Sequence, residues 1–150
     1  MSLKTKQIGP YFIGIEIDDD YIVQLSINET TQQDSDFSPL HVEAFKQLEE
    51  YFERERTSFD LPIQLVGTPF QKKVWQQLLD IPYGQVINYE QLAQRIEQPT
   101  AFRAVGNANG KNPLPIIVPC HRVINKNGHI GGYTGGVEVK ETLLKLEGVL

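Results

Sequence analysis

The sequence predicts an α+β protein, with a small antiparallel-sheet lobe at the N-terminal end and a mostly helical C-terminal domain that contains a helix-turn-helix and a short hairpin. Two strand-like runs open the chain, at residues 11–17 and 21–27, and three consecutive aspartates between them indicate a hairpin. From Thr68 onward, apolar residues recur at helical spacing instead. This change predicts two domains, residues 1–67 and residues 68–150.

The first domain is expected to be a scaffold. After the second strand, a polar stretch predicts a loop, and apolar residues at helical spacing predict a helix over residues 39–55. Ser38 is the expected cap of this helix, and Pro39 suits its first turn. Residues 1–67 contain no recognisable set of ligand-forming side chains.

The second domain begins with three predicted helices. Thr68 caps the first, which must end by Ile81 because the following proline disfavours helical geometry in the residue before it. Two short helices follow, over residues 88–96 and 101–110, with a tight break between them. Two short helices separated in this way are the outline of a helix-turn-helix.

The second of these short helices carries a strip of small residues. Ala101, Ala104 and Ala108 recur at helical spacing with Gly106 beside them, and Arg103 projects from the strip. Small residues on a helix are typical of close packing on another helix. They are equally compatible with a helix that lies in a nucleic-acid groove, where Arg103 would reach toward the bases or a phosphate.

The only cysteine of the sequence, Cys120, follows a rigid, proline-rich loop over residues 111–119 and precedes His121 and Arg122. A lone cysteine is often a small core hydrophobe. A fixed backbone, a cation and a histidine are also the neighbours that lower the pKa of a thiol and make its thiolate a nucleophile. Both interpretations stay open from the residues alone.

Beyond Cys120, residues 121–125 predict a strand, and Asn127-Gly128 predicts a tight hairpin turn. A glycine-rich stretch and a last helix complete the chain, and Glu147 lies in the final turn of that helix. Cys120, His121 and Glu147 could form a nucleophile, its base and the group that orients the base. Because neighbouring side chains on an extended backbone point opposite ways, the thiol and the imidazole would need a bend or a bridging water.

Composition narrows the class of protein. The net charge is −5, but residues 1–67 hold 5 basic and 13 acidic residues while residues 68–150 hold 9 and 6, so the second domain is mildly basic. One cysteine cannot form an internal disulfide, and the three histidines show no metal-ligand spacing, so no metal and no cofactor are expected. We also expect no signal peptide and no membrane span, which favours the cytoplasm.

From Thr68 to Gly148 the chain closely resembles a known family. The segments GTPFQKKVWQQLLDIPYG, AFRAVGNANGKNPLPIIVPCHRVI, GGYTGGVEVK and LLKLEG occur in fixed order. In these motifs it is similar to the methylated-DNA–protein-cysteine methyltransferases, also called O6-alkylguanine-DNA alkyltransferases. Residues 1–67 are compatible with the variable, sheet-containing N-terminal domain of that family.

The resemblance implies a role for each motif residue. Cys120 would take an alkyl group from O6 of guanine in duplex DNA, His121 would accept the thiol proton through a water, and Glu147 would hold the imidazole. The resemblance further implies that Asn112 fixes the loop and that Tyr89 stands at the pocket wall, where it assists nucleotide rotation and donates toward the departing guanine. The implied substrate pocket consists of Val123, Tyr133, Thr134, Pro115 and Gly131, and the implied DNA-binding residues are Arg103, Ala101, Ala104, Gly106 and Asn109.

The resemblance also implies how the protein acts. The helix of small residues would enter the minor groove, and Arg103 would fill the gap left by the flipped nucleotide. The resulting thioether is stable, so each molecule should react once and without a cofactor. The expected partner is double-stranded DNA that carries O6-alkylguanine, bound by a monomer in the bacterial cytosol or nucleoid. Repair of O4-alkylthymine and cooperative binding on DNA stay open.

Two positions depart from the pattern of the family. Asn88 stands where serine is common, and Glu97 stands where glycine is common and could weaken contact with phosphates. Three other interpretations remain. The protein could bind alkylated DNA and flag lesions without chemistry, could hydrolyse acyl substrates with its thiol, or could be a structural DNA-binding module. Reactivity of Cys120 toward alkylated DNA distinguishes all three from the transferase.

Overall fold

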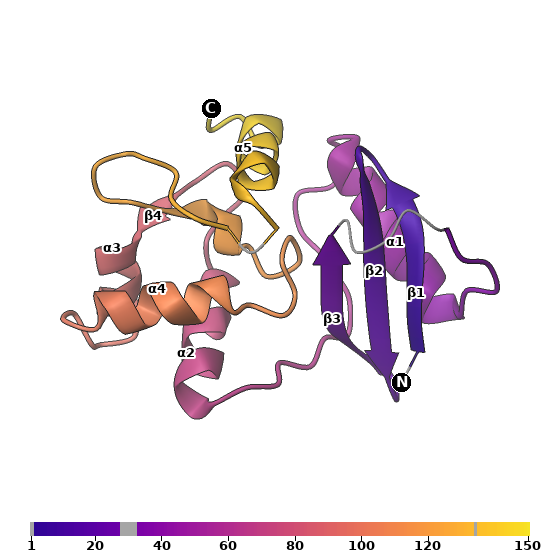
Figure 1. Cartoon of the computed structure of the whole chain (residues 1–150), viewed down its shortest axis with the longest axis horizontal. Helices are drawn as coiled ribbons and strands as arrows, with labels where there is room; N and C mark the ends of the chain where they lie inside the picture. Colours follow the sequence, from indigo (N-terminus) through magenta and orange to yellow (C-terminus); the bar gives the residue numbers. More distant parts are fainter. Residues whose placement is uncertain (1, 28–32, 134) are drawn as a thin grey trace. The chain divides into compact units, whose positions relative to one another are not determined.

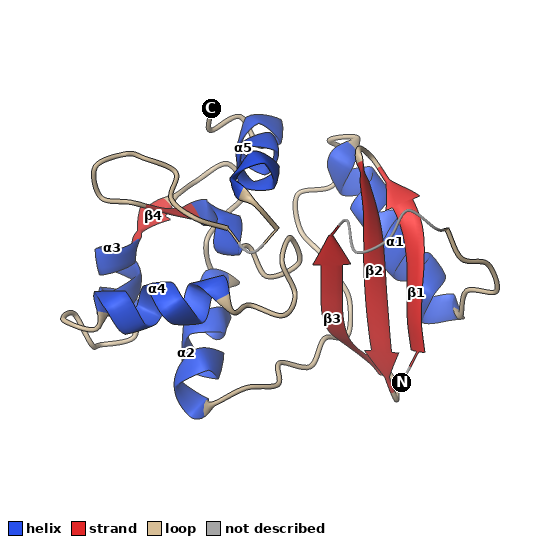
Figure 2. Cartoon of the chain, viewed as in Figure 1, coloured by secondary structure: helices blue, strands red, loops and turns tan. Residues whose placement is uncertain are grey.

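The computed structural model describes residues 2–27, 33–133 and 135–150. The chain forms two compact units, Met1–Leu65 and Val66–Leu150, which are described separately (Figure 1). Figure 2 shows that the three-stranded sheet belongs to the first unit and that most helices belong to the second. The predicted α+β class is therefore confirmed.

The first unit is a three-stranded antiparallel sheet with one helix packed on it. The strands follow sequence order, β1 (Ser2–Ile8), β2 (Tyr11–Asp18) and β3 (Tyr21–Ile27), and α1 (Pro39–Phe52) contacts β1 and β2. The predicted hairpin is formed, whereas strand β1 was not predicted. Its sequence, SLKTKQI, has too few apolar residues to give a strand signal, because it is an edge strand with mostly solvated side chains.

The core of the first unit lies between the sheet and α1. Ile13, Ile15 and Ile17 alternate along β2 and are buried on one face, and Leu48 and Tyr51 of α1 are buried as well. These side chains give the sheet one apolar face, as an antiparallel sheet with a solvated second face requires.

The second unit is built from four helices and a two-stranded sheet. Its elements are α2 (Pro69–Leu78), β4 (Ile87–Asn88), α3 (Tyr89–Arg95), α4 (Phe102–Gly110), a 3₁₀ turn (Cys120–Arg122), β5 (Val123–Ile124) and α5 (Val137–Leu146). Capping boxes begin α2 at Thr68 and α3 at Asn88. These caps confirm the predicted starts of both helices. The sequence could predict them because a capping box involves only residues that are close together in the chain.

Helices α3 and α4 form the helix-turn-helix, and α2 supports it from behind. The Trp75 indole of α2 donates a hydrogen bond to the Ala108 carbonyl of α4 over 2.8 Å. Ala108 is therefore buried, whereas Ala104 and Arg103 face outward and Ala101 is half-exposed. The strip of small residues is thus divided: its last alanine packs inside the unit, and the others stay on the outer surface.

The segment after Cys120 differs from its prediction. Residues 120–122 form a 3₁₀ turn, and the two-residue strand β5 pairs in parallel with β4 rather than with a return strand. A tight turn is present, since the Asn125 amide donates to the His129 carbonyl and Gly128 adopts φ +89°. The described residues after this turn form no strand, so the predicted hairpin is reduced to its turn.

Candidate active site

A locked loop places Cys120 inside the second unit. The Asn112 side chain donates to the Val118 carbonyl over 2.8 Å and accepts from the Leu114 amide over 2.9 Å. Ile116, in the same loop, adopts φ +75° and is buried. A β-branched residue in the left-handed region is strained, so the surrounding packing must hold the loop in this conformation.

The His121 side chain is bound to a carboxylate from the far end of the chain. Its Nε2 lies 2.6 Å from Oε2 of Glu147, the residue that terminates α5, and both side chains are fully buried. Because the carboxylate only accepts hydrogen bonds, Nε2 carries the proton and Nδ1 keeps its lone pair. None of the described residues forms a hydrogen bond with the buried Nδ1.

Arg122 binds the same carboxylate. Its Nε lies 2.9 Å from Oε1 of Glu147, and its Nη2 lies 3.0 Å from Oε2. The Gly84 amide donates to Oε1 over 3.1 Å as well. The carboxylate at the C-terminal end of α5, where the helix dipole opposes a negative charge, is stabilised by these donors.

The protonation states differ from the sequence-based expectation of a lowered thiol pKa. Burial raises the pKa of Cys120 to about 11, although Asn112, Lys140 and Tyr133 act in the opposite direction. Burial also lowers the pKa of His121 below its usual 6.5, against the effect of Glu147. At neutral pH the site therefore holds a neutral thiol beside a neutral base.

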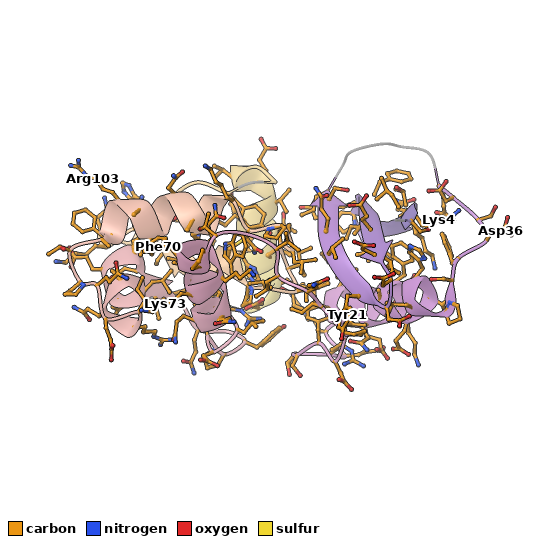
Figure 3. All side chains as sticks on the ribbon, turned by 90° about the horizontal axis from the view of Figure 1, so that it is seen from below. Lys4, Tyr21, Asp36, Phe70, Lys73 and Arg103 are labelled. Carbon is orange, nitrogen blue, oxygen red and sulfur yellow. The ribbon has the colours of Figure 1, made fainter. Side chains whose placement is uncertain are left out.

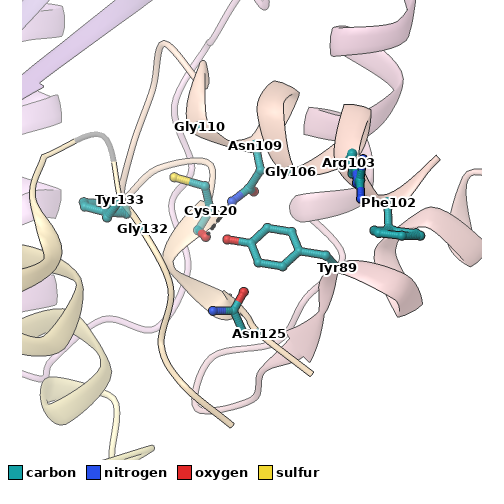
Figure 4. Close-up of a pocket in the computed structure, with 10 residues that line it drawn as sticks. All are labelled: Tyr89, Phe102, Arg103, Gly106, Asn109, Gly110, Cys120, Asn125, Gly132 and Tyr133. Carbon is teal, nitrogen blue, oxygen red and sulfur yellow. Dashed lines mark hydrogen bonds between the residues drawn. The ribbon is translucent and has the colours of Figure 1, made fainter. Parts of the chain in front are cut away.

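A pocket of about 550 Å³ leads from α4 to the thiol (Figure 4). In Figure 4 the Tyr89 side chain lies between Cys120 at one end of the pocket and Phe102 and Arg103 at the other. The pocket is lined by Tyr89, Phe102, Arg103, Gly106, Asn109, Gly110, Cys120, Asn125, Gly132 and Tyr133. Its volume is within the range of sites that bind small organic groups.

Of the predicted site residues that the structure describes, six line this pocket: Tyr89, Arg103, Gly106, Asn109, Cys120 and Tyr133. A Cβ at Gly131 would lie 3.4 Å from the Tyr89 hydroxyl, so this glycine permits a close approach. Val123 and Pro115 are buried and do not line the pocket, and Thr134 lies outside the described residues. Asn109 was expected on the DNA-binding face, but it is buried on the pocket side and donates to the Cys120 carbonyl over 3.3 Å.

Sequence reasoning missed two functional candidates in the interior. Lys140 of α5 is buried, and its Nζ donates to the carbonyls of Val123 and Gly132 over 2.7 and 3.1 Å. Burial lowers the pKa of Lys140 to about 8. The sequence did contain a signal for Lys140, because this lysine is three residues from both Val137 and Leu143 and therefore lies on the apolar side of its helix. The second candidate is Arg122, which was recognised from the sequence only as a cationic neighbour of the thiol.

Phe102 was also missed. This side chain is 42% exposed and lies next to Arg103 at the start of α4. Figure 3 shows Arg103 pointing outward from α4. An exposed aromatic side chain beside an exposed arginine is a feature of surfaces that contact stacked bases.

Together, the fold and the site define a helix-turn-helix protein with a buried cysteine that is followed by a buried histidine bound to a glutamate. Comparison with known proteins agrees with this class. The profile described as "6-O-methylguanine DNA methyltransferase, DNA binding domain" matches residues 69–149, and that of its "ribonuclease-like domain" matches residues 11–65. The chain therefore belongs to the 6-O-methylguanine DNA methyltransferase family.

Individual relatives show the same likeness. The methylated-DNA–protein-cysteine methyltransferase of Methanosarcina acetivorans is 55% identical over 71% of this chain and 68% of its own length. The constitutive enzyme of that name from Bacillus subtilis is 52% identical over 73% of this chain and 67% of its own length. The crystal structure of Mycobacterium tuberculosis OGT in complex with DNA superposes with a TM-score of 0.87 at 40% identity, covering 97% of this chain and 91% of that one.

The described residues lack two features that are typical of other classes of protein. None of their helices is long and apolar enough to cross a membrane. None of their His, Cys, Asp and Glu side chains gather into a group of three or more that could hold a metal ion.

Proposed function

We propose that this protein repairs DNA by transferring the alkyl group of O6-alkylguanine in duplex DNA to the sulfur of Cys120. The observation that carries this proposal is the pocket itself, which joins the outer surface of the helix-turn-helix to a thiol beside a neutral histidine. Its DNA-bound relative supports a DNA partner. A guanine would have to leave the base stack to reach the thiol, and enzymes that act on a base commonly flip it out in this way.

The proposed chemistry is a single displacement. The thiol proton passes through a water to Nδ1 of His121, whose Nε2–H remains bound to Glu147. The sulfur attacks the alkyl carbon, the carbon–oxygen bond breaks, and its electron pair leaves with the guanine. The departing base takes a proton, for which Tyr89 is the proposed donor: burial raises the pKa of Tyr89, so the phenol is protonated at neutral pH.

The product explains why the protein would act once. The new carbon–sulfur bond is a thioether, and none of the described residues that line the pocket is equipped to hydrolyse it. Each chain would therefore accept one alkyl group, without a cofactor and without turnover.

The proposed DNA interface is the outer face of α4. Ala104, Gly106 and the half-exposed Ala101 leave this face smooth, so the helix would lie in the minor groove with Arg103 in the place of the flipped nucleotide. The basic second unit fits such a partner, since residues 68–150 carry three more basic than acidic residues. We propose that a monomer binds, in the bacterial cytosol where its DNA substrate lies.

The decisive experiment is a mass measurement. The protein is mixed with a duplex that carries one O6-methylguanine, and its intact mass is recorded. We expect a gain of one methyl group per chain, located on Cys120, and no gain in Cys120→Ala. An unchanged mass would refute the transfer. Tight binding to the same duplex without methylation would instead support a lesion-flagging protein, which the raised pKa of the thiol would then explain.

A second experiment separates DNA binding from chemistry. Arg103→Ala should slow methyl transfer from duplex DNA more than transfer from the free alkylated base, because the free base needs no flipping. Exposed Lys145 on α5 offers a control, Lys145→Ala, that removes one charge outside the helix-turn-helix. Equal slowing on both substrates would place Arg103 outside the flipping step.

A further inference from the structure

Arg122 and His121 share one buried carboxylate. Oε2 of Glu147 accepts both from Nε2 of His121 over 2.6 Å and from Nη2 of Arg122 over 3.0 Å, while Nε of Arg122 binds Oε1. The side chains of His121 and Glu147 are fully buried, and that of Arg122 is 8% exposed. A charge in such a place needs a partner of opposite sign.

The guanidinium is held in this position by groups other than Glu147. Its Nη1 donates to the Ile81 carbonyl over 2.7 Å, and its Cζ lies 5.7 Å from the centre of the Tyr83 ring. These contacts come from the segment that follows α2, whereas Glu147 comes from the end of α5. Arg122 therefore joins two segments at the base of the site and cannot easily turn away.

This arrangement determines which side chain supplies the positive charge that balances the Glu147 carboxylate. A guanidinium keeps its proton at all ordinary pH values, so Arg122 balances Glu147 permanently. If Arg122 were neutral, a protonated His121 would be the nearest cation able to replace it. Among the described residues, Lys140 of α5 also acts on His121, and its charge disfavours an imidazolium. The thiol of the neighbouring residue, Cys120, is neutral at rest.

We propose that Arg122 is a positioning residue of the alkyl-transfer reaction, because it occupies the cationic place beside Glu147 and so keeps His121 neutral, with Nδ1 free to take the thiol proton. The kinetic part of this inference rests on the proposed function. Its structural part, the protonation state of His121, does not depend on any substrate.

The test compares two substitutions at one position. Arg122→Met removes both the positive charge and the two hydrogen bonds to Glu147. Arg122→Lys keeps the charge but can no longer bind both carboxylate oxygens at once. The pH dependence of methyl transfer to Cys120 is measured by intact mass. In parallel, the His121 ring is titrated by NMR in the protein without DNA, which gives a readout independent of activity.

We expect Arg122→Met to raise the midpoint of both curves by roughly 1 to 3 pH units, the usual effect of one close charge. Its transfer rate should fall at pH values between the wild-type midpoint and the raised midpoint, and it should recover in more alkaline solution. Arg122→Lys should retain the wild-type midpoint and show a lower rate at every pH. A merely structural role would lower the rate without moving the midpoint.

Three outcomes would overturn the inference: unchanged midpoints in a folded Arg122→Met protein, an equal shift in Arg122→Lys, or a wild-type His121 that titrates above its usual 6.5. The last measurement remains decisive if the methionine variant fails to fold. Failure of the wild type to become methylated would refute the proposed function instead, and the NMR titration would still test the charge argument.

Discussion

The Cys120 thiol keeps its proton at neutral pH, and His121, which we propose as the base that removes this proton, is the next residue in the chain. The two residues lie in a 3₁₀ turn, so their side chains are not held on opposite sides as they would be on an extended strand. Both reacting groups are neutral before the substrate arrives, because burial penalises a thiolate and an imidazolium alike. Charge would therefore develop only during the reaction.

This model predicts the shape of the pH–rate profile. Since His121 must be neutral to accept the proton, the transfer rate should rise through a midpoint below 6.5 and then stay level to about pH 9. A preformed thiolate would instead give a rate that climbs about tenfold per pH unit toward the thiol pKa of about 11. Single-turnover rates followed by intact mass distinguish the two, with His121→Gln as the variant that should lose the lower inflection.

Residue-level prediction from the sequence had a clear limit. The proline-rich loop and the family motifs were sufficient to single out Cys120, His121 and Glu147. The sequence could not show that the guanidinium of Arg122 binds Glu147. The orientation of the guanidinium depends on the Ile81 carbonyl and the Tyr83 ring, which are distant from Arg122 in the sequence. Nor could it show the raised pKa of the thiol, since burial is a property of the assembled core.

At the level of secondary structure, local signals predicted most of the fold. Caps and apolar spacing identified α1, α2, α3, α4 and α5, because both kinds of signal arise within a few residues. Strand β1 escaped prediction since its side chains are mostly polar. The parallel pairing of β4 with β5 escaped it because each strand has only two residues and the partners are distant in sequence.

The cap of α3 gives a test of one departure from the family pattern. The Asn88 side chain accepts from the Gln91 amide over 2.8 Å, and the Gln91 side chain accepts from the Asn88 amide over 2.8 Å. Asn88→Ala should cost about 1 kcal/mol of unfolding free energy in urea, whereas Asn88→Ser should be nearly neutral. An alanine variant as stable as the wild type would show that the capping box contributes nothing here.

The exposed aromatic side chain of α4 gives a second test at this scale. Phe102→Ala should weaken binding to alkylated duplex DNA by roughly 1 to 3 kcal/mol if the ring stacks on a base, as aromatic side chains do in other nucleic-acid complexes. The salt dependence of binding should not change, because no charge is removed. Fluorescence anisotropy measures both quantities. Leu79→Ala, an exposed apolar residue outside α4, is the matched control and should bind normally.

On the scale of the whole molecule, charge is divided between two compact units. Residues 1–67 carry eight more acidic than basic residues, while residues 68–150 carry three more basic ones. The acidic unit would repel a phosphate backbone, so it favours orientations in which the basic unit meets the DNA. Duplex affinity should accordingly fall as salt increases, and Arg103→Ala should reduce the slope of that dependence by about 1.

Burial of the thiol leads to a prediction about the intact protein. Cys120 is 1% exposed and holds its proton, so iodoacetamide should alkylate the native protein far more slowly than a denatured sample at the same pH. Intact mass over time gives both rates. Labelling of the native protein at the denatured rate would show that the pocket leaves the sulfur open to any small electrophile.

A protein that reacts once must still hold its sulfur in reduced form when a lesion finally appears. Peroxide and other oxidants convert exposed, ionised cysteines to sulfenic and then irreversible acids, and this chain has no second cysteine to reverse the damage as a resolving thiol. A buried, protonated Cys120 resists such loss. Burial that slows the reaction of the thiol with small electrophiles should therefore also slow its oxidation, so that the unreacted protein stays competent for longer.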